Sequence, residues 1–592
     1  MNALMGNGET CHGGRVRTAA VALVCAVLVA SCGGDDDEAD TSEDRVSTET
    51  TETRGDGSPP ATTEPTVSDT TFPEPGVEVT YGGELIVGLE AEASGLRPWA
   101  DPASSSAENL MNAIYDQLMK QTADGEVEGY LAESLEPDDK FTVWTMTLRP
   151  GVTFSNGTPL TAQTIADMFP IQQTGPTAAA GIAAAGLTGV EATGELEVTY
   201  TLARPNSAFA SSLTDPTLGM PFDPAVAAAD PSGFSENPIG TGPFTVESRD
   251  IDNETVVVRR DDYWFATDDG NRLPYLDTIR FRPTPDEGNR LVALVSGTTD
   301  AMTTLRGATI RDTRADQDGL TLIEFQGNRT GGGMYNTAVA PLDDVRVRRG
   351  LTWMVDSERL IEAGGSAGIS EPATQWYAPG SLYWTQEAAD SYLSFDFEAG
   401  AASLQEYIDD PGRSDGKDPG ERIEVTLACP PDPTLIASMQ VIQQVWDDSG
   451  LVDVTLSQFD EATHVSDMIN DRHQAHCWRF SGQGDPGASL APFVADPAVS
   501  IGNVTNFVSP TMQEAVAEAN RTGDVEERRA LFSEVMQEVN DQALLWYSGH
   551  TAMLVATDDS VRGVDSWELP NGKVGNGIPE AVAMWSQVYI SE

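Results

Sequence analysis

The order of apolar segments between residues 423 and 482 constrains the fold more than any other feature of the chain. The stretches IEVTLAC, LVDVTLSQF and HCWRFSG are short and rich in β-branched and aromatic residues, which is typical of strands. Between them, TLIASMQVIQQVWDDSG and THVSDMIND place apolar residues at helical spacing. Because strands that alternate with crossover helices pair in parallel, this region predicts a parallel α/β sheet.

Further elements are predicted on both sides of that unit. The stretches GGELIVGLE, KFTVWTMTL, NETVVVRR and LDTIRFRP are expected strands, and SSSAENLMNAIYDQLM is an expected capped helix. Ser509 and Asp524 can each cap a C-terminal helix. The second of these helices carries an apolar stripe that we expect in the core, formed by Leu531, Phe532, Val535, Met536 and Val539. Residues 81–592 exceed the usual size of one domain, so two or three domains are predicted.

Residues 1–31 have the pattern of an export signal, because Arg15 and Arg17 precede a run of apolar and small residues. That run is too short to cross a bilayer, which needs about 20 apolar residues. The stretch LVASC resembles the bacterial lipobox, in which the cysteine is lipidated and becomes the N-terminus. We therefore predict lipidation of Cys32, and the alternative is an ordinary signal peptide cleaved nearby. Residues 32–80 are acidic and poor in large apolar side chains, which predicts a disordered tether.

The net charge limits the classes of partner, and the cysteines bear on the redox state of the compartment. The formal net charge of −59 at pH 7 argues against nucleic acid and against adsorption on anionic lipid, so we expect membrane contact through the lipid anchor alone. Export would bring Cys429 and Cys477 into an oxidising compartment. The two cysteines either form a disulfide there or remain as buried thiols.

Four stretches over residues 81–592 carry a resemblance to a known family. They are YLAESLEPDDKFTVWTMTLRPGVTFSNGTPLTAQTIADMF, NPIGTGPFTVESRD followed by VVVRRDDYW, MYNTAVAPLDDVRVRRGLTWMVDSERLI, and SGQGDPGASLAPF. Their order and spacing together resemble family 5 of the extracellular solute-binding proteins, the oligopeptide-, dipeptide- and nickel-binding lipoproteins of ABC importers. Each stretch alone is a modest match.

The resemblance implies an α/β, two-lobed periplasmic-binding-protein-like fold with two crossing hinge strands and an extra inserted domain. In that fold the ligand is trapped between the lobes. We expect lobe I at residues 81–117, 236–330 and 551–592, the inserted domain at residues 118–235, and lobe II at residues 331–550.

The fourth stretch bears on the ligand. Peptide-binding members of the family place an aspartate three residues before an Asp-Pro pair, and this aspartate binds the α-ammonium group of the peptide. Here Asp485 begins the Asp-Pro pair, and Gly482 occupies the anchoring position. This departure puts recognition of free-amine peptides in doubt. Asp485 and Gln483 are predicted to contact a polar group of the ligand, and the alternative is a turn at the Asp-Pro pair.

Aromatic side chains are predicted to line the ligand site. Trp376 and Tyr377 lie in a loop with a Pro-Gly turn, and Trp478 lies on the strand that leads to Gly482. Trp99 follows SGLRP, where the resemblance places a Leu-Asp-Pro near the ligand. The alternative for each of these residues is packing in the core.

Two motifs point to other kinds of chemistry, and neither has the context that its site requires. The stretch GGSAG around Ser366 fits the nucleophile elbow of hydrolases, but that elbow needs a strand before it and a helix after it. His473, His476 and Cys477 lack a further ligand at the usual spacing of a metal site. We therefore predict neither an enzyme nor a metal or cofactor. The arginines that follow Asp343 are expected to lie on a solvated face or to form scaffold ion pairs, and the alternative is ligand contact. They are Arg346, Arg348 and Arg349.

The resemblance and the N-terminal pattern together predict an exported, lipid-anchored, monomeric solute receptor on the outer face of the cell membrane, its periplasmic side. It would capture a peptide or a similar small solute between its lobes and deliver it to an ABC permease and its ATPase. The alternative from another class is a signalling or cell-envelope interaction protein that reuses the same fold.

Overall fold

The computed structural model describes residues 79–591, except residues 268–269, 316, 460, 471, 483–484, 499 and 501. The predicted export signal, the predicted lipidation site Cys32 and nearly all of the predicted tether lie outside the described residues. The predicted ligand contact Gln483 lies outside them as well.

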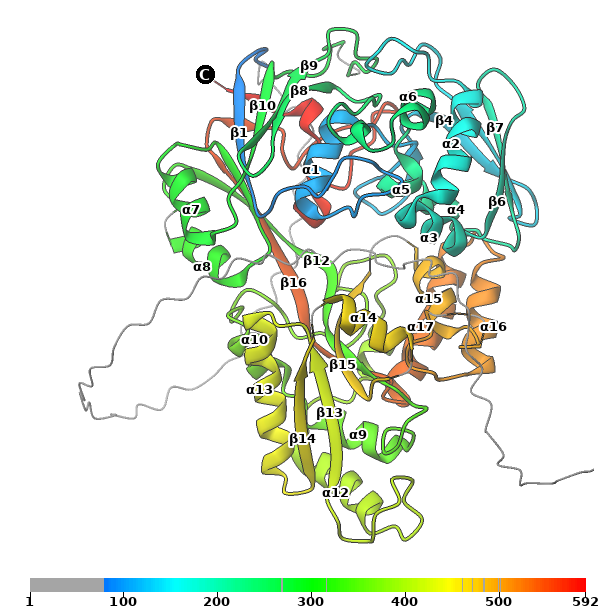
Figure 1. Cartoon of the computed structure of the whole chain (residues 1–592), viewed down its shortest axis with the longest axis vertical. Coiled ribbons are helices and arrows are strands. Elements are labelled where there is room, and N and C mark those ends of the chain that lie inside the picture. The colour runs from blue at the N-terminus through cyan, green and yellow to red at the C-terminus, as the bar shows by residue number, and fades with distance from the viewer. Residues whose placement is uncertain are drawn as a thin grey trace, which may run out of the picture.

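A ten-stranded mixed sheet runs through the molecule and links two lobes (Figure 1). We use the name lobe I for the part that carries β1 and β8–β11, and the name lobe II for the part that carries β13–β15. The long strands β12 and β16 lie between these parts. In order along the sheet, the strands are β14 (Val452–Gln458), β13 (Ile423–Cys429), β15 (Ala475–Ser481), β12 (Leu320–Tyr335), β16 (Leu545–Asp558), β11 (Ala301–Thr304), β1 (Glu84–Leu89), β10 (Thr278–Pro283), β9 (Glu254–Arg259) and β8 (Phe244–Asp250).

Strands β12 and β16 cross from one lobe to the other as an antiparallel pair (Figure 1). Two glycines of β12 allow close approach of the neighbouring strands. A Cβ atom on Gly332 would lie 2.0 Å from the carbonyl oxygen of Trp546, and one on Gly333 would lie 2.4 Å from that of His476. Larger residues are therefore excluded where β12 lies between β15 and β16.

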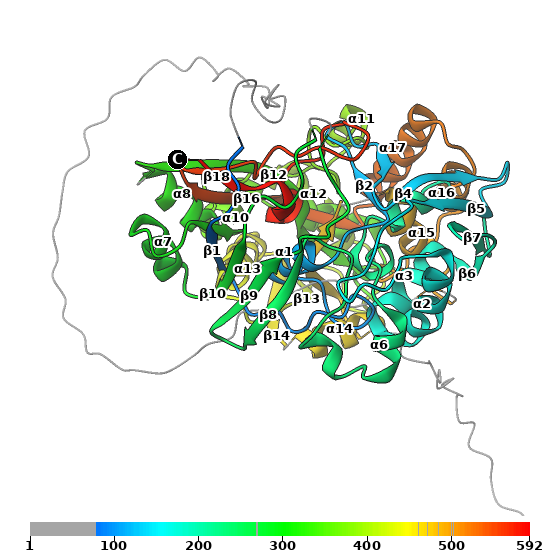
Figure 2. The ribbon, with the colours of Figure 1, turned by 90° about the horizontal axis from the view of Figure 1, so that it is seen from above.

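In lobe I, β1 pairs in parallel with β10 and β11. A separate four-stranded antiparallel sheet lies within the predicted inserted domain (Figure 2). It shares one apolar core with lobe I. Its strands, in order, are β4 (Ala132–Pro137), β5 (Val143–Leu148), β7 (Glu197–Leu202) and β6 (Leu187–Ala192). The longer helices of this region are α1 (Ser105–Ile114), α2 (Ala162–Thr174), α3 (Pro176–Ala185), α7 (Glu287–Val295) and α8 (Gly307–Ala315).

In lobe II, β13 pairs in parallel with both β14 and β15, which confirms the predicted parallel α/β unit. Apolar cores lie on both faces of these strands. Helices α9, α12 and α13 contribute to one core, and α15, α16 and α17 contribute to the other. The helices of lobe II are α9 (Val345–Trp353), α10 (Ser357–Ala363), α11 (Gln386–Asp390), α12 (Phe397–Ile408), α13 (Pro433–Asp448), α14 (Glu461–Ile469), α15 (Pro486–Val494), α16 (Pro510–Ala519) and α17 (Val525–Asp541).

The two C-terminal helices begin at the residues that the sequence predicts as caps. The Ser509 hydroxyl accepts a hydrogen bond from the backbone N–H of Met512, and the Asp524 carboxylate accepts one from that of Glu527. The apolar stripe of α17 lies in the core, as predicted, with Leu531 partly buried at its edge. Within the described part of the chain, no helix combines the length and the apolar character that crossing a membrane requires.

Candidate functional site

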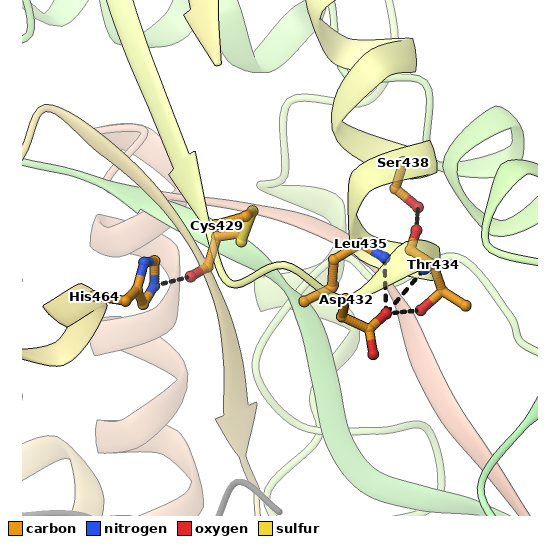
Figure 3. The surroundings of a disulfide bond; sticks show 7 residues. Cys429, Asp432, Thr434, Leu435, Ser438 and His464 are labelled. Carbon is orange, nitrogen blue, oxygen red and sulfur yellow. Dashed lines mark hydrogen bonds between the residues drawn. A yellow bond between two sulfur atoms is a disulfide. The ribbon is translucent and has the colours of Figure 1, made fainter. Parts of the chain in front are cut away.

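A disulfide joins the carboxyl end of β13 to the neighbouring strand β15. It links Cys429 to Cys477 across 48 residues of sequence, with the two Cα atoms 5.4 Å apart (Figure 3). Both cysteines are buried. The bond thus fixes the end of β13 from which the loop to α13 departs. Of the two alternatives that the sequence left open, a disulfide and two buried thiols, the structure contains the disulfide.

Asp432 lies in this loop and caps α13. Its carboxylate accepts hydrogen bonds from the backbone N–H groups of Thr434, at 2.9 Å, and Leu435, at 3.1 Å (Figure 3). Burial alone would raise the pKa of Asp432, but hydrogen bonds from Thr434 and Leu435 and the charges of Arg306 and Arg479 outweigh it, so the pKa is lowered. The side chain is therefore a carboxylate at neutral pH.

Arg306 brings lobe I into contact with this loop of lobe II. It follows β11, and its Nη1 lies 3.5 Å from Oδ2 of Asp432. Its Nε lies 3.7 Å from Oε1 of Glu287 on α7. The Arg306 side chain is 39% exposed, and an ion pair at that exposure contributes at most about 1 kcal/mol. The contact between the lobes can therefore form and separate at small cost.

Glu90 adds a partly buried carboxylate to the same region. It follows β1, accepts a hydrogen bond of 2.8 Å from the backbone N–H of Leu305, and lies 3.6 Å from the guanidinium of the buried Arg290. Burial raises the pKa of Glu90, and the charge of Arg290 opposes that rise. Lobe I therefore presents a connected set of charges toward lobe II.

Arg479 completes this group from the side of lobe II. It lies on β15, two residues beyond Cys477, and its side chain is partly buried. Burial lowers the pKa of Arg479; Asp432 opposes this effect, whereas Arg306 and Arg329 add to it. We use the name junction cluster for Glu90, Arg306, Arg329, Asp432 and Arg479.

A second contact between the parts of the molecule lies beside α15–α17 (Figure 2). Ser207, in the predicted inserted domain, donates its hydroxyl to the carbonyl oxygen of Ala519 at 3.0 Å. The backbone N–H of Ser207 donates to the carbonyl oxygen of Asn520, also at 3.0 Å. Arg528 of α17 donates to the Ser207 hydroxyl and to the Ala519 carbonyl oxygen as well. These hydrogen bonds join the predicted inserted domain to lobe II beside the helices α15–α17.

Asp485 belongs to this second contact. One oxygen of its carboxylate accepts from Arg528 and from the backbone N–H of Gly487, and so caps α15. The other oxygen accepts a hydrogen bond of 2.8 Å from the hydroxyl of Tyr383. Both oxygens are thus engaged within the protein, and the ligand contact proposed for Asp485 from the sequence stays a prediction.

The family profile described as "Bacterial extracellular solute-binding proteins, family 5 Middle" matches residues 126–500, which is more than half of the chain. The chain belongs to this family.

Two relatives of this solute-binding protein illustrate the range of the family. It is 26% identical to the nickel-binding periplasmic protein of Escherichia coli (strain K12) over 464 residues, which cover 75% of this chain and 85% of that protein. It is 25% identical to the dipeptide-binding protein of the same organism over 380 residues, which cover 62% of this chain and 66% of that protein.

Solved structures show the same fold. The ABC transporter substrate-binding protein CtaP from Listeria monocytogenes has a TM-score of 0.69 at 19% identity, covering 87% of this chain and 100% of that one. The oligopeptide-binding protein AppA from Bacillus subtilis, in complex with a nonapeptide, has a TM-score of 0.67 at 18% identity, covering 87% and 100%. These likenesses and the mixed α/β sheet confirm the predicted two-lobed fold class.

The relatives are solute-binding proteins and not enzymes, in agreement with the prediction for this chain. The surroundings of Ser366 in this solute-binding protein fit that conclusion. The stretch GGSAG follows α10 directly, and the next helix, α11, begins at Gln386. The strand before and the helix after the serine that a nucleophile elbow requires are therefore both missing from the described residues around Ser366.

Three of the four predicted aromatic contacts are buried in this solute-binding protein. Trp376 is 7% exposed, and its ring packs 5.0 Å from that of Phe480 in the core of lobe II. Tyr377 is 1% exposed in the same core. Trp99 is 4% exposed, and its ring lies 4.2 Å from that of Phe222 in the core of lobe I.

Trp478 differs from these three because its side chain is only partly buried. It lies on β15 next to Arg479, and its ring is parallel to that of His464 at 6.3 Å. Because successive side chains of a strand point to opposite faces, Trp478 lies on the other face of β15 from Arg479 and packs against the core that contains α15–α17. The ligand contacts of all four remain predictions.

A polar hollow of about 550 Å³ lies on lobe II around the start of α9. Its arginines are bound within the lobe. Arg346 pairs with Asp344 at 2.6 Å and with Asp410 at 3.0 Å, and Arg348 donates to the carbonyl oxygens of Leu342 and Gln542. This hollow lies away from the junction cluster, and its contacts are those of a scaffold.

Three histidines form a buried group next to the disulfide. The rings of His464 and His476 lie 4.3 Å apart, and those of His473 and His476 lie 4.9 Å apart. Burial, together with the neighbouring His464 and His473, lowers the pKa of His476 to about 2. Among the described residues, no group of three or more His, Cys, Asp or Glu side chains is arranged to hold a metal ion.

We expect acid to destabilise the protein through His476 of this group and through His550, a buried histidine of β16. The pKa of His476 falls from 6.5 to about 2, and burial lowers that of His550 from 6.5 to about 4. Because the unfolded chain binds the proton more readily, stability is complete above pH 6.5 and declines as the pH falls through this window. At pH 5 each histidine should cost about 2 kcal/mol.

Urea unfolding at pH 7 and at pH 5 measures this loss. His476→Gln should show a smaller loss than wild type by about 2 kcal/mol, because glutamine has no proton to gain in this range. An equal loss in both proteins would contradict the assignment.

The junction cluster was missed in the sequence. Its members come from five separate segments, so no local spacing joins them. One signal was available, because Arg479 lies within HCWRFSG, and a charged residue inside a buried strand needs an explanation.

Proposed function

We propose that this protein is the solute-binding component of an ABC importer. It captures a small solute between its two lobes as a monomer and delivers it to a permease that is driven by a separate ATPase. Membership of the family supports the class of function. The observation that carries the proposal is the meeting of charged residues from both lobes, with Arg306 of lobe I 3.5 Å from Asp432 of lobe II.

Closure by a hinge motion fits the way in which the lobes are joined. Two strands, β12 and β16, link them, and small residues such as Gly332 and Gly333 lie at the crossing. The contact between Arg306 and Asp432 is partly exposed and weak. A solute that contacts both lobes would add interactions that exist in the closed state alone, and would shift the population toward that state.

The proposed lobe boundaries agree with such a hinge. Lobe II would extend from residue 331 to residue 550, and both limits lie inside the crossing strands β12 (Leu320–Tyr335) and β16 (Leu545–Asp558). We place the hinge in these strands.

Native mass spectrometry of the full chain, purified from membranes in detergent without added solute, tests the function. A closed receptor should retain a bound small molecule. Returning that molecule to the emptied protein should raise stability by about 2.7 kcal/mol at one hundred times its dissociation constant. A protein that carries no bound mass, and that no peptide or metal salt stabilises, would speak against solute capture.

The N-terminal sequence supports a further part of the proposal, an anchor at Cys32. Two or more acyl chains hold a protein stably on a membrane, at about 0.8 kcal/mol for each buried methylene. The acidic segment up to residue 80 would then separate the lobes from the surface.

Substitution of Cys32 by serine should release the protein from membranes. The serine cannot form the thioether link to the lipid, so no acyl chain remains. Membrane and soluble fractions are compared by immunoblot after a carbonate wash, with Cys11→Ser as the matched control that stays anchored. Retention of the Cys32→Ser variant in the washed membranes would refute the anchor.

A further inference from the structure

Arg479 is a cation without a partner of its own. Its guanidinium forms no hydrogen bond and no ion pair with any of the residues that the structure describes. The side chain is partly buried, and its pKa is lowered chiefly by burial. A guanidinium offers five N–H donors and is costly to desolvate unless an acceptor is supplied. Because none of the described residues supplies an acceptor, the guanidinium is available to an acceptor from outside the chain.

The position of Arg479 in the sheet directs it toward the junction of the lobes. In the antiparallel pair of β12 and β15, Arg479 lies opposite Gly331, and Arg329 lies opposite Ser481. Side chains two residues apart along a strand share one face, so Arg329 and Arg479 are diagonal neighbours on the same face. Cys477 shares this face and faces the core that contains the disulfide.

Two arginines and two carboxylates of the described residues act on the charge of Arg479. Arg306 and Arg329 each lower its pKa by repulsion, whereas Asp432 and Glu90 raise it. Asp432 already accepts two backbone hydrogen bonds and contacts Arg306. Glu90 already accepts from Leu305 and faces Arg290. The two carboxylates that favour the charged form of Arg479 are thus each engaged by other groups of the protein.

The same region offers little to a ligand ammonium group. The position at which peptide-binding members carry an aspartate is Gly482, which has no side chain and is buried. The nearby carboxylate of Asp485 is engaged by Arg528, Tyr383 and Gly487. A cationic end of a solute would therefore meet arginine rather than a free carboxylate.

We propose that Arg479 binds an oxyanion of the captured solute, a carboxylate or a phosphate, at the junction of the two lobes. This inference rests on the proposed function, because it names the class of solute for the same site. The planar fork of the guanidinium matches the two oxygens of such a group. Arg306 lies on the other lobe, so an anion held by both arginines would favour the closed state.

The experiment compares wild type with Arg479→Gln, Arg479→Lys and Arg472→Gln in the full chain. Arg472 is the matched control, an arginine of the same lobe that is 58% exposed and pairs with Asp467 at 2.7 Å. Native mass spectrometry identifies any bound solute. Calorimetric titration then uses that solute and four probes: N-acetyl-alanyl-alanine, its C-terminal amide, alanyl-alanine amide and inorganic phosphate.

The expected result is binding of an anionic solute or probe that Arg479→Gln weakens about 10- to 100-fold, the loss of one charge-assisted, bidentate contact. Arg479→Lys should lose less, and Arg472→Gln should match wild type. A solute bound equally by wild type and Arg479→Gln, or a preference for the amide probes, would overturn the inference and leave solute capture standing. No bound mass and no binding of any probe would overturn both.

Stability without solute separates this role from a structural one. Because Arg479 has no partner among the described residues, Arg479→Gln should unfold at the same temperature as wild type or a higher one. A large loss of stability in the solute-free variant would show that Arg479 serves the fold, and would overturn the inference.

Discussion

Replacement of both Cys429 and Cys477 by alanine should lower the stability of lobe II by about 4 kcal/mol. The bond closes a loop of 48 residues, and in the chain-entropy account a crosslink of that size restricts the unfolded state by about this amount. Both residues are 3% exposed, so alanine introduces no buried polar atom. Urea unfolding followed by tryptophan fluorescence measures the change, since Trp446 is buried in this lobe.

Reduction of the wild-type protein provides the control. Wild type treated with a thiol reductant should unfold at the same urea concentration as the double alanine variant, and the variant should be insensitive to the reductant. The two lobes can unfold separately. The variant and the reduced wild type are therefore compared at the unfolding transition of lobe II and not at a single midpoint for the whole protein. A loss below 1 kcal/mol would show that the pairing of β13 with β15 already restricts the ends of the loop without the bond.

The parts of the fold that depend on local pattern could be predicted from the sequence. The alternation of strands and helices over residues 423–482 gave the parallel unit, because side-chain periodicity and chain reversal are properties of neighbouring residues. The caps at Ser509 and Asp524 followed from the same kind of information. The connection of the lobes through two crossing strands came from the family resemblance and not from periodicity.

The site depends on contacts that local pattern does not encode. Arg306 and Asp432 meet because two separate strands, β11 and β13, end near each other in the folded chain. The burial of the aromatic residues is likewise not encoded in local pattern. Position in a loop suggested access to a ligand, yet Trp376 packs between Phe480 and Phe493, because a loop that crosses a core face buries its large side chains.

Asp485→Asn should cost about 3 kcal/mol, because it removes one partner of an enclosed ion pair. The side chains of Arg528 and Asp485 are 4% and 11% exposed. Breaking such a pair leaves a desolvated charge on Arg528, which costs more than the pair itself contributes. Asparagine keeps an oxygen for the N–H of Gly487, so the cap of α15 is preserved and the loss reports on the ion pair. Thermal and urea unfolding measure it.

Asp453→Asn is the matched control, because Asp453 pairs with Arg422 where the two side chains are 52% and 41% exposed. That change should cost less than about 1 kcal/mol. Equal losses in the two variants would contradict the burial argument.

The same variant separates the two interpretations of Asp485. Its carboxylate oxygens are occupied by protein donors, so Asp485→Asn should bind the solute with unchanged affinity once the protein is folded. A direct ligand contact would produce the reverse, a loss of affinity with little change in stability. Arg528 also donates a hydrogen bond to Ser207 in the predicted inserted domain, so a third combination of changes in stability and affinity would be informative. Loss of stability together with weaker binding would mean that the pair holds the closed state, and that Asp485 acts on the solute through the position of the lobes.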